Sequence, residues 1–168
     1  MTHRTDLVVI AIARHHDHIL IVQQQGTHDP HPYWALPGGL VETGELLTEA
    51  LIRETYEETG IQIEAIGRLA YCSQIDRPRH NAQTLAFAFE IESWSGTPDS
   101  RDPDGEILQV TWVPLADALE RLHKIGWRGM REPALAYLRG ERAAGAMWLY
   151  RANADDQEFV ACLAANNV

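Results

Sequence analysis

The sequence predicts a layered α/β (α+β) fold in which strands and two helices share one domain. Short runs rich in Val, Ile and Leu, bounded by turn-forming residues, are typical of strands. Apolar residues at spacings of three and four are typical of amphipathic helices. The strand-like runs cover residues 7–13, 18–24, 61–75, 83–92 and 106–113, and the helical patterns cover 45–60 and 115–122. Such elements bury their apolar faces against one another in layers.

Length and cysteine content favour a single cytoplasmic domain. The 168 residues are enough for one hydrophobic core, so we expect one domain over 1–168. Cys72 and Cys162 are the only cysteines and make no disulfide framework, which favours a reducing compartment. The first residues lack the cleavage region of a signal peptide, and no run of about 18 apolar residues exists. A soluble protein that is not exported is expected.

The net charge restricts the class of ligand. At −10, the chain is not expected to bind nucleic acid or a membrane surface, because both are polyanions. A small phosphorylated ligand fits this charge if a metal ion supplies the positive charge.

The chain opens with a predicted hairpin and a glycine turn. Runs 7–13 and 18–24 read as adjacent strands, and the histidines between them read as surface residues, because they lack Cys or carboxylate partners at metal-ligand spacing. Trp34 is expected in the core. Pro37, Gly38 and Gly39 then allow a tight turn with little side-chain obstruction.

The next element is a predicted helix of three to four turns. Glu42 or Thr43 can cap a helix that begins near Glu45 or Leu46, and Gly60 is the kind of residue that ends one.

This helix carries an unusual acidic face. Its apolar stripe of Leu47, Ala50 and Leu51 continues, at helical spacing, into three glutamates. Like charges at this spacing repel, and the negative end of the helix dipole disfavours them further. One guanidinium, from Arg53, does not balance three acids, and carboxylate oxygens suit Mg²⁺ or Mn²⁺. A divalent-metal site is therefore predicted, the alternative being a solvated acidic face paired with Arg53. The three glutamates are Glu54, Glu57 and Glu58.

The spacing around this face resembles the Nudix box of the Nudix hydrolase family (MutT-like). One position departs from the pattern: Thr55 stands where the family generally has an aliphatic residue, which should alter packing beneath the helix. The lead-in 36–39, Leu-Pro-Gly-Gly, is also similar to the family's. The matching box residues are Gly39, Glu45, Arg53, Glu54, Glu57, Glu58 and Gly60.

The resemblance implies a fold and a reaction. The fold is the Nudix α/β/α sandwich, a mixed sheet between helices. The reaction is metal-dependent hydrolysis of a pyrophosphate bond in a nucleoside diphosphate linked to another group. The implied metal ligands are the Gly38 carbonyl, Glu54, Glu57 and Glu58, with Glu54 alternatively the general base. Arg53 is expected to orient the glutamates, and Glu45 to fix the loop and helix.

Two regions beyond the box add candidate site residues. Strand-like runs 61–75 and 83–92 form a second predicted antiparallel pair, and the connection between them, 76–81, is the most basic short segment of an acidic chain. Arg77 and Arg79 there are either a solubilising tip or contacts to substrate phosphates, and we favour the latter. Glu106, at the start of the predicted strand that Pro114 stops, resembles the extra metal ligand or base of the family.

From residue 126 the resemblance fades, so 126–168 is treated as a C-terminal extension of unclear role. A helix over 130–138 and a short strand over 146–150 are expected there. Trp148 and Tyr150 cover either an edge of the domain or an interface between two chains, so a monomer or a homodimer is expected.

The predicted function is a Mg²⁺-dependent pyrophosphohydrolase, with Mn²⁺ as a substitute. The alternatives are a non-catalytic nucleotide-binding sensor, which would usually have lost box carboxylates, and an isomerase, which needs a reactive cysteine. Segment 71–81 matches neither the pattern expected of an ADP-ribose hydrolase nor that of an NADH pyrophosphatase. ADP-ribose, other nucleotide sugars, nucleoside triphosphates and dinucleoside polyphosphates therefore stay open as substrates.

Overall fold

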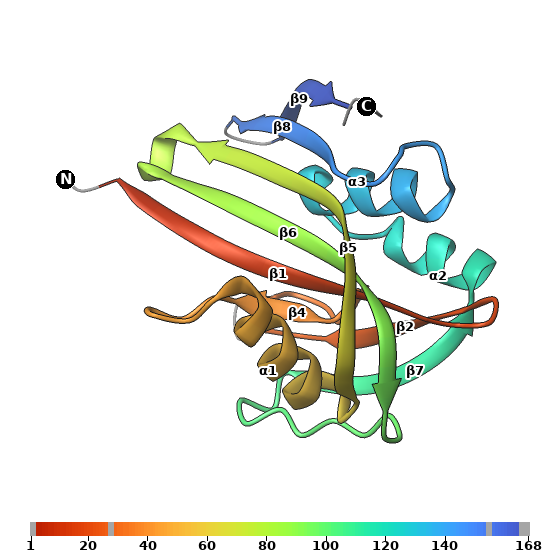
Figure 1. Ribbon diagram of the computed structural model, residues 1–168. Coiled ribbons are helices and arrows are strands. Elements are labelled where there is room, and N and C mark those ends of the chain that lie inside the picture. Colours follow the sequence, from red (N-terminus) through yellow and green to blue (C-terminus); the bar gives the residue numbers. More distant parts are fainter. Residues whose placement is uncertain (1–2, 27–28, 154–155, 165–168) are drawn as a thin grey trace.

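The computed structural model describes residues 3–26, 29–153 and 156–164, so parts of the predicted 1–168 domain lie outside the described residues. Its sheet contains both parallel and antiparallel strand pairs (Figure 1). The elements are β1 (Arg4–His15), β2 (His18–Gln24), β3 (Tyr33–Ala35), β4 (Gly38–Leu40), α1 (Leu47–Thr59), β5 (Gln62–Arg77), η1 (Pro78–His80), β6 (Ala82–Ser95), β7 (Ile107–Pro114), α2 (Leu115–Leu122), α3 (Arg128–Leu138), β8 (Ala146–Ala152) and β9 (Gln157–Leu163).

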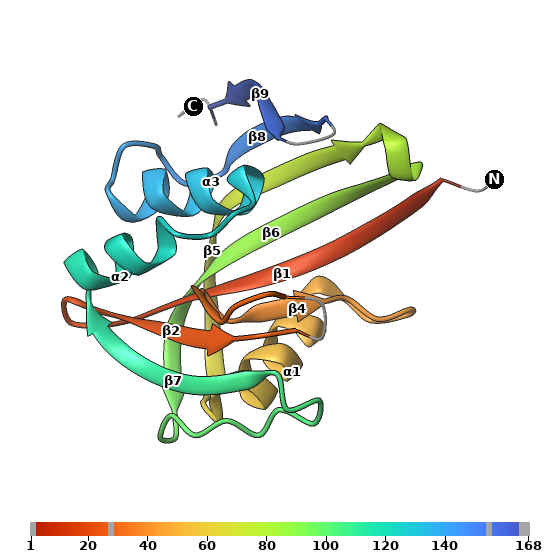
Figure 2. The ribbon, with the colours of Figure 1, turned by 180° about the vertical axis from the view of Figure 1, so that it is seen from behind.

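The strands form a mixed sheet with helices on both faces. Its order is β3-β2-β1-β6-β5-β8-β9, while β4 pairs with β1 and β7 pairs with β2. The pairs β1–β6 and β5–β8 are parallel, and the other pairs are antiparallel. Helix α1 lies on one side of β1 and β6, and α2 and α3 lie on the other, as Figure 1 and the view from behind in Figure 2 agree. The expected sandwich of a mixed sheet between helices is confirmed.

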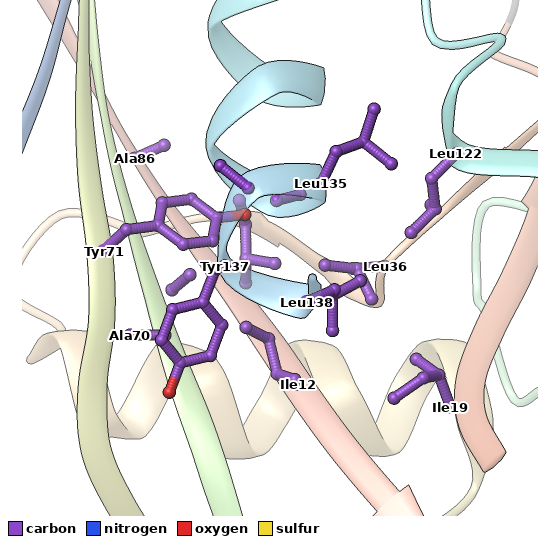
Figure 3. Packing of buried hydrophobic residues seen from close by; sticks show 14 of the residues in the cluster. Ile12, Ile19, Leu36, Ala70, Tyr71, Ala86, Leu122, Leu135, Tyr137 and Leu138 are labelled. Carbon is purple, nitrogen blue, oxygen red and sulfur yellow. The ribbon is translucent and has the colours of Figure 1, made fainter. Parts of the chain in front are cut away.

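Each face of the sheet carries its own hydrophobic core. Successive side chains of a strand point to opposite faces, so Ile10 and Ile12 of β1 join the core under α2 and α3, whereas Val9 and Ala11 join the core under α1. Figure 3 shows Leu135 and other residues of α3 packed over β1, β5 and β6. The alternation in β1 thus fixes which residues face the box helix.

The predicted hairpins and helices are found, but the predicted cap of the box helix is wrong. The N-cap of α1 is Leu46, with no side-chain cap. Glu42 and Glu45 instead close a turn before the helix, in which the Glu42 N–H donates to Glu45 Oε2 at 3.0 Å and the Glu45 N–H donates to the Glu42 carbonyl at 3.1 Å. Glu49 accepts the Leu46 N–H at 2.8 Å. The C-cap is Gly60 with φ 71°, as predicted.

The region after residue 126 belongs to the same sheet. Strand β8 pairs in parallel with β5, and β9 adds a further antiparallel strand. Trp148 and Tyr150 are buried in the core under α3, and both rings contact Phe159 of β9. This region therefore covers the edge that β5 would otherwise expose.

No helix in the described part of the chain combines the length and apolarity needed to cross a membrane.

Candidate active site

The glycine turn brings β4 and the box helix into close contact. A Cβ at Gly38, where φ is +152°, would stand 2.0 Å from the Val9 carbonyl oxygen of the neighbouring β1. A Cβ at Gly39 would stand 2.4 Å from the Glu54 carboxyl group. Both positions need glycine, the first for strand pairing and the second because a carboxylate of α1 rests directly over the backbone.

Gly39→Ala is expected to lower catalytic turnover about tenfold while leaving most of the stability intact. The added methyl group meets the flexible end of Glu54, which can swing away, whereas misplacing a reacting group by about 1 Å can cost up to about 100-fold in rate. Steady-state kinetics and a thermal melt of the variant measure the two effects. Wild-type kcat in a folded Gly39→Ala protein would show that the position of Glu54 over this turn is unimportant.

Arg53 connects the loop before the helix with the acidic face. Its Nε and Nη2 donate to the two oxygens of Glu45, both at 2.9 Å, and Nη1 donates to Glu54 at 2.9 Å and Glu57 at 3.2 Å. A further hydrogen bond of 3.0 Å runs from Nη2 to the Leu40 carbonyl. The hydrogen bonds that Arg53 donates to Glu45 lower the pKa of Glu45 to about 2 and raise the pKa of Arg53. The arginine thus holds two box carboxylates in place.

Glu58 is the most buried carboxylate of the acidic face. It is 8% exposed, and Oε2 accepts one hydrogen bond, from the Gly38 N–H at 2.8 Å. Burial raises its pKa to about 8, with Glu54 and Asp102 raising it further and the Gly38 N–H opposing the shift. Burial also raises the pKa of Glu54, against the opposing effect of Arg53.

A divalent cation fits this donor set. Glu58 is a buried carboxylate with a neighbouring carboxylate and one neutral donor, so its charged form lacks compensation in the protein alone. Hard oxygen ligands are those that Mg²⁺ and Mn²⁺ prefer. Among the residues that the structure describes, no three His, Cys, Asp or Glu side chains already converge on one point. Ligation by Glu54 or Glu57 therefore needs a change of side-chain position, and in each of them one oxygen accepts no bond from Arg53 and can turn to a metal ion while the other stays bound.

Glu106 lies beside the loop that precedes β3. Its backbone carbonyl accepts the Gln25 N–H at 2.9 Å, and its carboxylate stands 3.5 Å from the place of a Cβ on Gly26. The charges of Glu106 and Glu58 both raise the pKa of Tyr33, after its burial and the charge of Asp29. The structure therefore places Glu106 and the box glutamate Glu58 in the surroundings of the same tyrosine.

Two residues of this region escaped the sequence analysis. The Asp102 carboxylate accepts the N–H groups of Glu106 and Ile107, and it raises the pKa of Glu58. Tyr33 accepts a hydrogen bond of 2.6 Å from Gln24. The Asp-Pro-Asp-Gly sequence beginning at Asp102 is a turn signal in which the first Asp commonly binds nearby backbone N–H groups, and it indicates the local role of Asp102.

The structure does not bring Arg77 and Arg79 to the box carboxylates. Arg77 of β5 pairs with Ala82 of β6, which pairs in turn with Arg4 of β1. Gly38 of β4 instead pairs with Ile10, six residues further along β1. Six residues of strand at ~3.3 Å each separate these two positions on β1 by roughly 20 Å. Contact with substrate by these arginines stays a prediction, and the geometry restricts it to parts far from the box.

Comparisons with known proteins agree with the family resemblance seen in the box residues. A family model described as NUDIX domain matches residues 1–133. An NAD-capped RNA hydrolase of Schizosaccharomyces pombe is 33% identical over 131 residues, covering 78% of this chain and 33% of that protein. An ADP-sugar pyrophosphatase of Mus musculus is 31% identical over 120 residues, covering 67% of this chain and 52% of that protein. The chain thus spans between a third and about half of the length of these two relatives.

A solved structure gives the same arrangement of elements. The mutator MutT protein of Bacillus halodurans superposes with a TM-score of 0.69 at 20% identity, over 94% of this chain and 96% of that one. At this identity the similarity establishes the fold alone.

Proposed function

Because the chain belongs to the NUDIX domain family, we propose that it hydrolyses the pyrophosphate bond of a nucleoside diphosphate linked to another moiety. Enzymes of this family generally use a divalent metal, and we propose Mg²⁺, with Mn²⁺ as a substitute. The observation that carries the proposal is Glu58, a buried carboxylate beside Gly38 that lacks a compensating cation. A metal ion at this place would supply that charge.

The residues of the box divide into ligands and supports. Glu54, Glu57, Glu58 and the Gly38 carbonyl would hold the metal, and Glu106 would add a ligand or base from the loop before β7. When bound, the metal polarises phosphate oxygens and lowers the pKa of a coordinated water. Glu54 is alternatively the residue that accepts the proton from the attacking water.

Arg53 and Glu45 act through the ligands. The bonds of Arg53 to Glu54 and Glu57, at 2.9 and 3.2 Å, hold the two carboxylates, of which Glu54 lies over Gly39. The two bonds of Arg53 to Glu45 anchor the guanidinium to the loop. This network reduces the reorganisation needed when substrate binds.

The two alternative functions have no specific support. A nucleotide-binding sensor would be expected to have lost box carboxylates, and all are present. The isomerase alternative needs a reactive thiol, whereas burial raises the pKa of Cys72 and so disfavours its thiolate.

The names of the relatives extend the candidate substrates to NAD-capped RNA and ADP-sugars. Both contain a nucleoside diphosphate linked to another group, which is the class proposed for this chain. The two free cysteines fit a reducing compartment, and we place the enzyme in the cytoplasm.

A panel of NAD⁺, ADP-ribose, ADP-glucose, nucleoside triphosphates and dinucleoside polyphosphates tests the proposal. With Mg²⁺ or Mn²⁺, at least one compound is expected to yield a nucleoside monophosphate or pyrophosphate, and EDTA is expected to abolish the reaction. Product analysis by chromatography identifies the bond that breaks. Tight nucleotide binding without turnover of any compound would support the sensor instead.

A further inference from the structure

A groove opens where β5, η1 and β6 meet the segment before α3. Two adjoining cavities of about 470 and 340 Å³ share Arg77, His80 and Trp127. Arg79, Gly126 and Gln157 continue the wall of the larger cavity, and Arg4 and Ala82 continue that of the smaller one. We call these two cavities together the Trp127 groove.

The Trp127 groove is separate from the box. It lies at the level of Arg4 on β1, six residues and roughly 20 Å from Ile10, which pairs with Gly38. Arg77 belongs to the sheet face that carries α3. It lies four residues after Ser73 on β5 and so points to the same face, and the Ser73 hydroxyl donates to the Gly129 carbonyl of α3 at 2.7 Å. Helix α1 covers the opposite face (Figures 1 and 2). A mononucleotide held at the box therefore does not fill this groove.

An exposed aromatic ring forms the centre of the groove. Trp127 is 48% exposed although it lies on a short link between two helices. The guanidinium carbon of Arg77 lies 5.9 Å from the ring centroid. Asp6 holds that guanidinium through a 2.6 Å bond to Nη2, and Arg77 Nε is buried without a partner in the described part of the chain. Trp127 is thus a supported platform on which a planar base can stack.

The groove gathers three arginines, Arg4, Arg77 and Arg79, and His80 around a single acidic side chain among its described lining residues, Asp156, which pairs with Arg128. Arg79 is exposed and makes no ion pair among the described residues, and His80 beside it is exposed as well. Asp6 neutralises part of the charge of Arg4 and Arg77. Because Arg79 has no such acidic partner among the described residues, its guanidinium stays available to a ligand. An arginine fork next to a stacking ring is the combination that binds a phosphate together with its base.

We propose that the Trp127 groove binds a nucleotide, with the base stacked on Trp127 and the phosphate held by Arg79. Two ligands share this chemistry: a free mononucleotide, and the far nucleotide of a long substrate whose pyrophosphate lies at the box. The second source rests on the proposed function, whereas binding itself does not.

Binding is tested with AMP, which has no pyrophosphate bond. In a ¹⁵N-labelled protein, AMP is expected to shift the indole N–H signal of Trp127 in a saturable manner and to leave those of Trp34, Trp94, Trp112 and Trp148 in place. Trp127→Phe identifies the signal by its loss. An unshifted Trp127 signal at AMP concentrations on the order of 10 mM would overturn the proposal.

Variants distinguish binding of AMP at this specific site from a general attraction between its phosphate and the positive charges of the protein. Trp127→Ala and Arg79→Gln are each expected to weaken AMP binding at least about tenfold in calorimetric titration, and Trp127→Phe to preserve most of it. Arg142→Gln is the matched control, because Arg142 is also exposed, makes no ion pair among the described residues and lies beyond the other end of α3. Equal losses in Arg79→Gln and Arg142→Gln would reduce the effect to net charge and overturn the site.

Kinetics of Trp127→Ala distinguish the two sources. If the groove holds the far nucleotide of a substrate, KM for a dinucleoside polyphosphate long enough to span the roughly 20 Å from the box rises about tenfold, while KM for a nucleoside triphosphate and both kcat values stay unchanged. If it holds a free mononucleotide, neither KM changes and AMP binding is still lost. Either pattern supports the groove. A wild-type protein that binds AMP at Trp127 but hydrolyses nothing would remove the proposed function and keep the site.

Discussion

Glu57→Gln is expected to reduce kcat at least about 100-fold at saturating Mg²⁺. Loss of a group that only orients a metal ligand costs about 10–100-fold, and loss of a charged ligand should cost more. The fold should persist, because the side chain of Glu57 is 33% exposed and makes one hydrogen bond in the described part of the chain, the 3.2 Å bond from Arg53. Steady-state kinetics on the best substrate of the panel measure the loss.

The control for this variant is Glu64→Gln. Glu64 is an exposed residue of β5, and its replacement makes the same change in charge and size away from the box. Mg²⁺ should raise the melting temperature of the wild type and of Glu64→Gln, since ligands that bind only the native state stabilise it by mass action, and should raise that of Glu57→Gln less. Wild-type turnover in Glu57→Gln would show that Glu57 is not a ligand.

The box could be read from the sequence because its geometry is local. Helical spacing alone places Arg53 within reach of Glu57, and the predicted orienting role of Arg53 agrees with its hydrogen bonds to Glu54 and Glu57. The strands around it followed from equally local signals, such as the run rich in Val, Ile and Leu that forms β1. Gly38 and Gly39 were recognised as a turn, although the structure also makes them part of a three-residue strand, β4.

The position of Arg77 could not be predicted in the same way. The strand that contains it follows the box helix directly, which suggested a loop near the box. That strand, β5, has 16 residues, so at ~3.3 Å per residue its path is roughly 50 Å long. The predicted run 61–75 already had nearly this length, but its course away from the box could not be predicted, because the bulges and the pairing with β6 and β8 are set by residues distant in sequence.

Other parts were missed for related reasons. The capping prediction failed because Glu45 uses its carboxylate on Arg53 and on the Glu42 N–H, and both contacts depend on how the loop folds back. The charge of Asp102, in the loop before β7, raises the pKa of Glu58 in α1, and this proximity of two residues distant in sequence could not be predicted. Strand β9 was not predicted, and the structure finds it paired antiparallel with β8.

Without metal, the protein is expected to lose stability as the pH rises from about 5 to about 8. Burial raises the pKa of Glu58 from 4.5 to about 8 in the folded state. The folded protein therefore binds more protons than the unfolded chain between these values, and the free energy of unfolding falls with rising pH. The loss is complete above the folded pKa and is on the order of 5 kcal/mol. Glu54, whose pKa is also raised by burial, acts in the same direction.

Glu58→Gln isolates this contribution. The amide keeps a carbonyl oxygen that can accept the Gly38 N–H, but it has no charge to bury, so the variant should be more stable than the wild type at pH 8.5 and nearly equal to it at pH 5. Urea unfolding in EDTA at both pH values measures the difference. Mg²⁺ should reverse the order at pH 8.5, because it stabilises the wild-type carboxylate and has less to bind in the variant. A variant that is less stable than the metal-free wild type at pH 8.5 would mean that the protein itself already compensates the Glu58 charge, and the main argument for a metal ion at this place would fail.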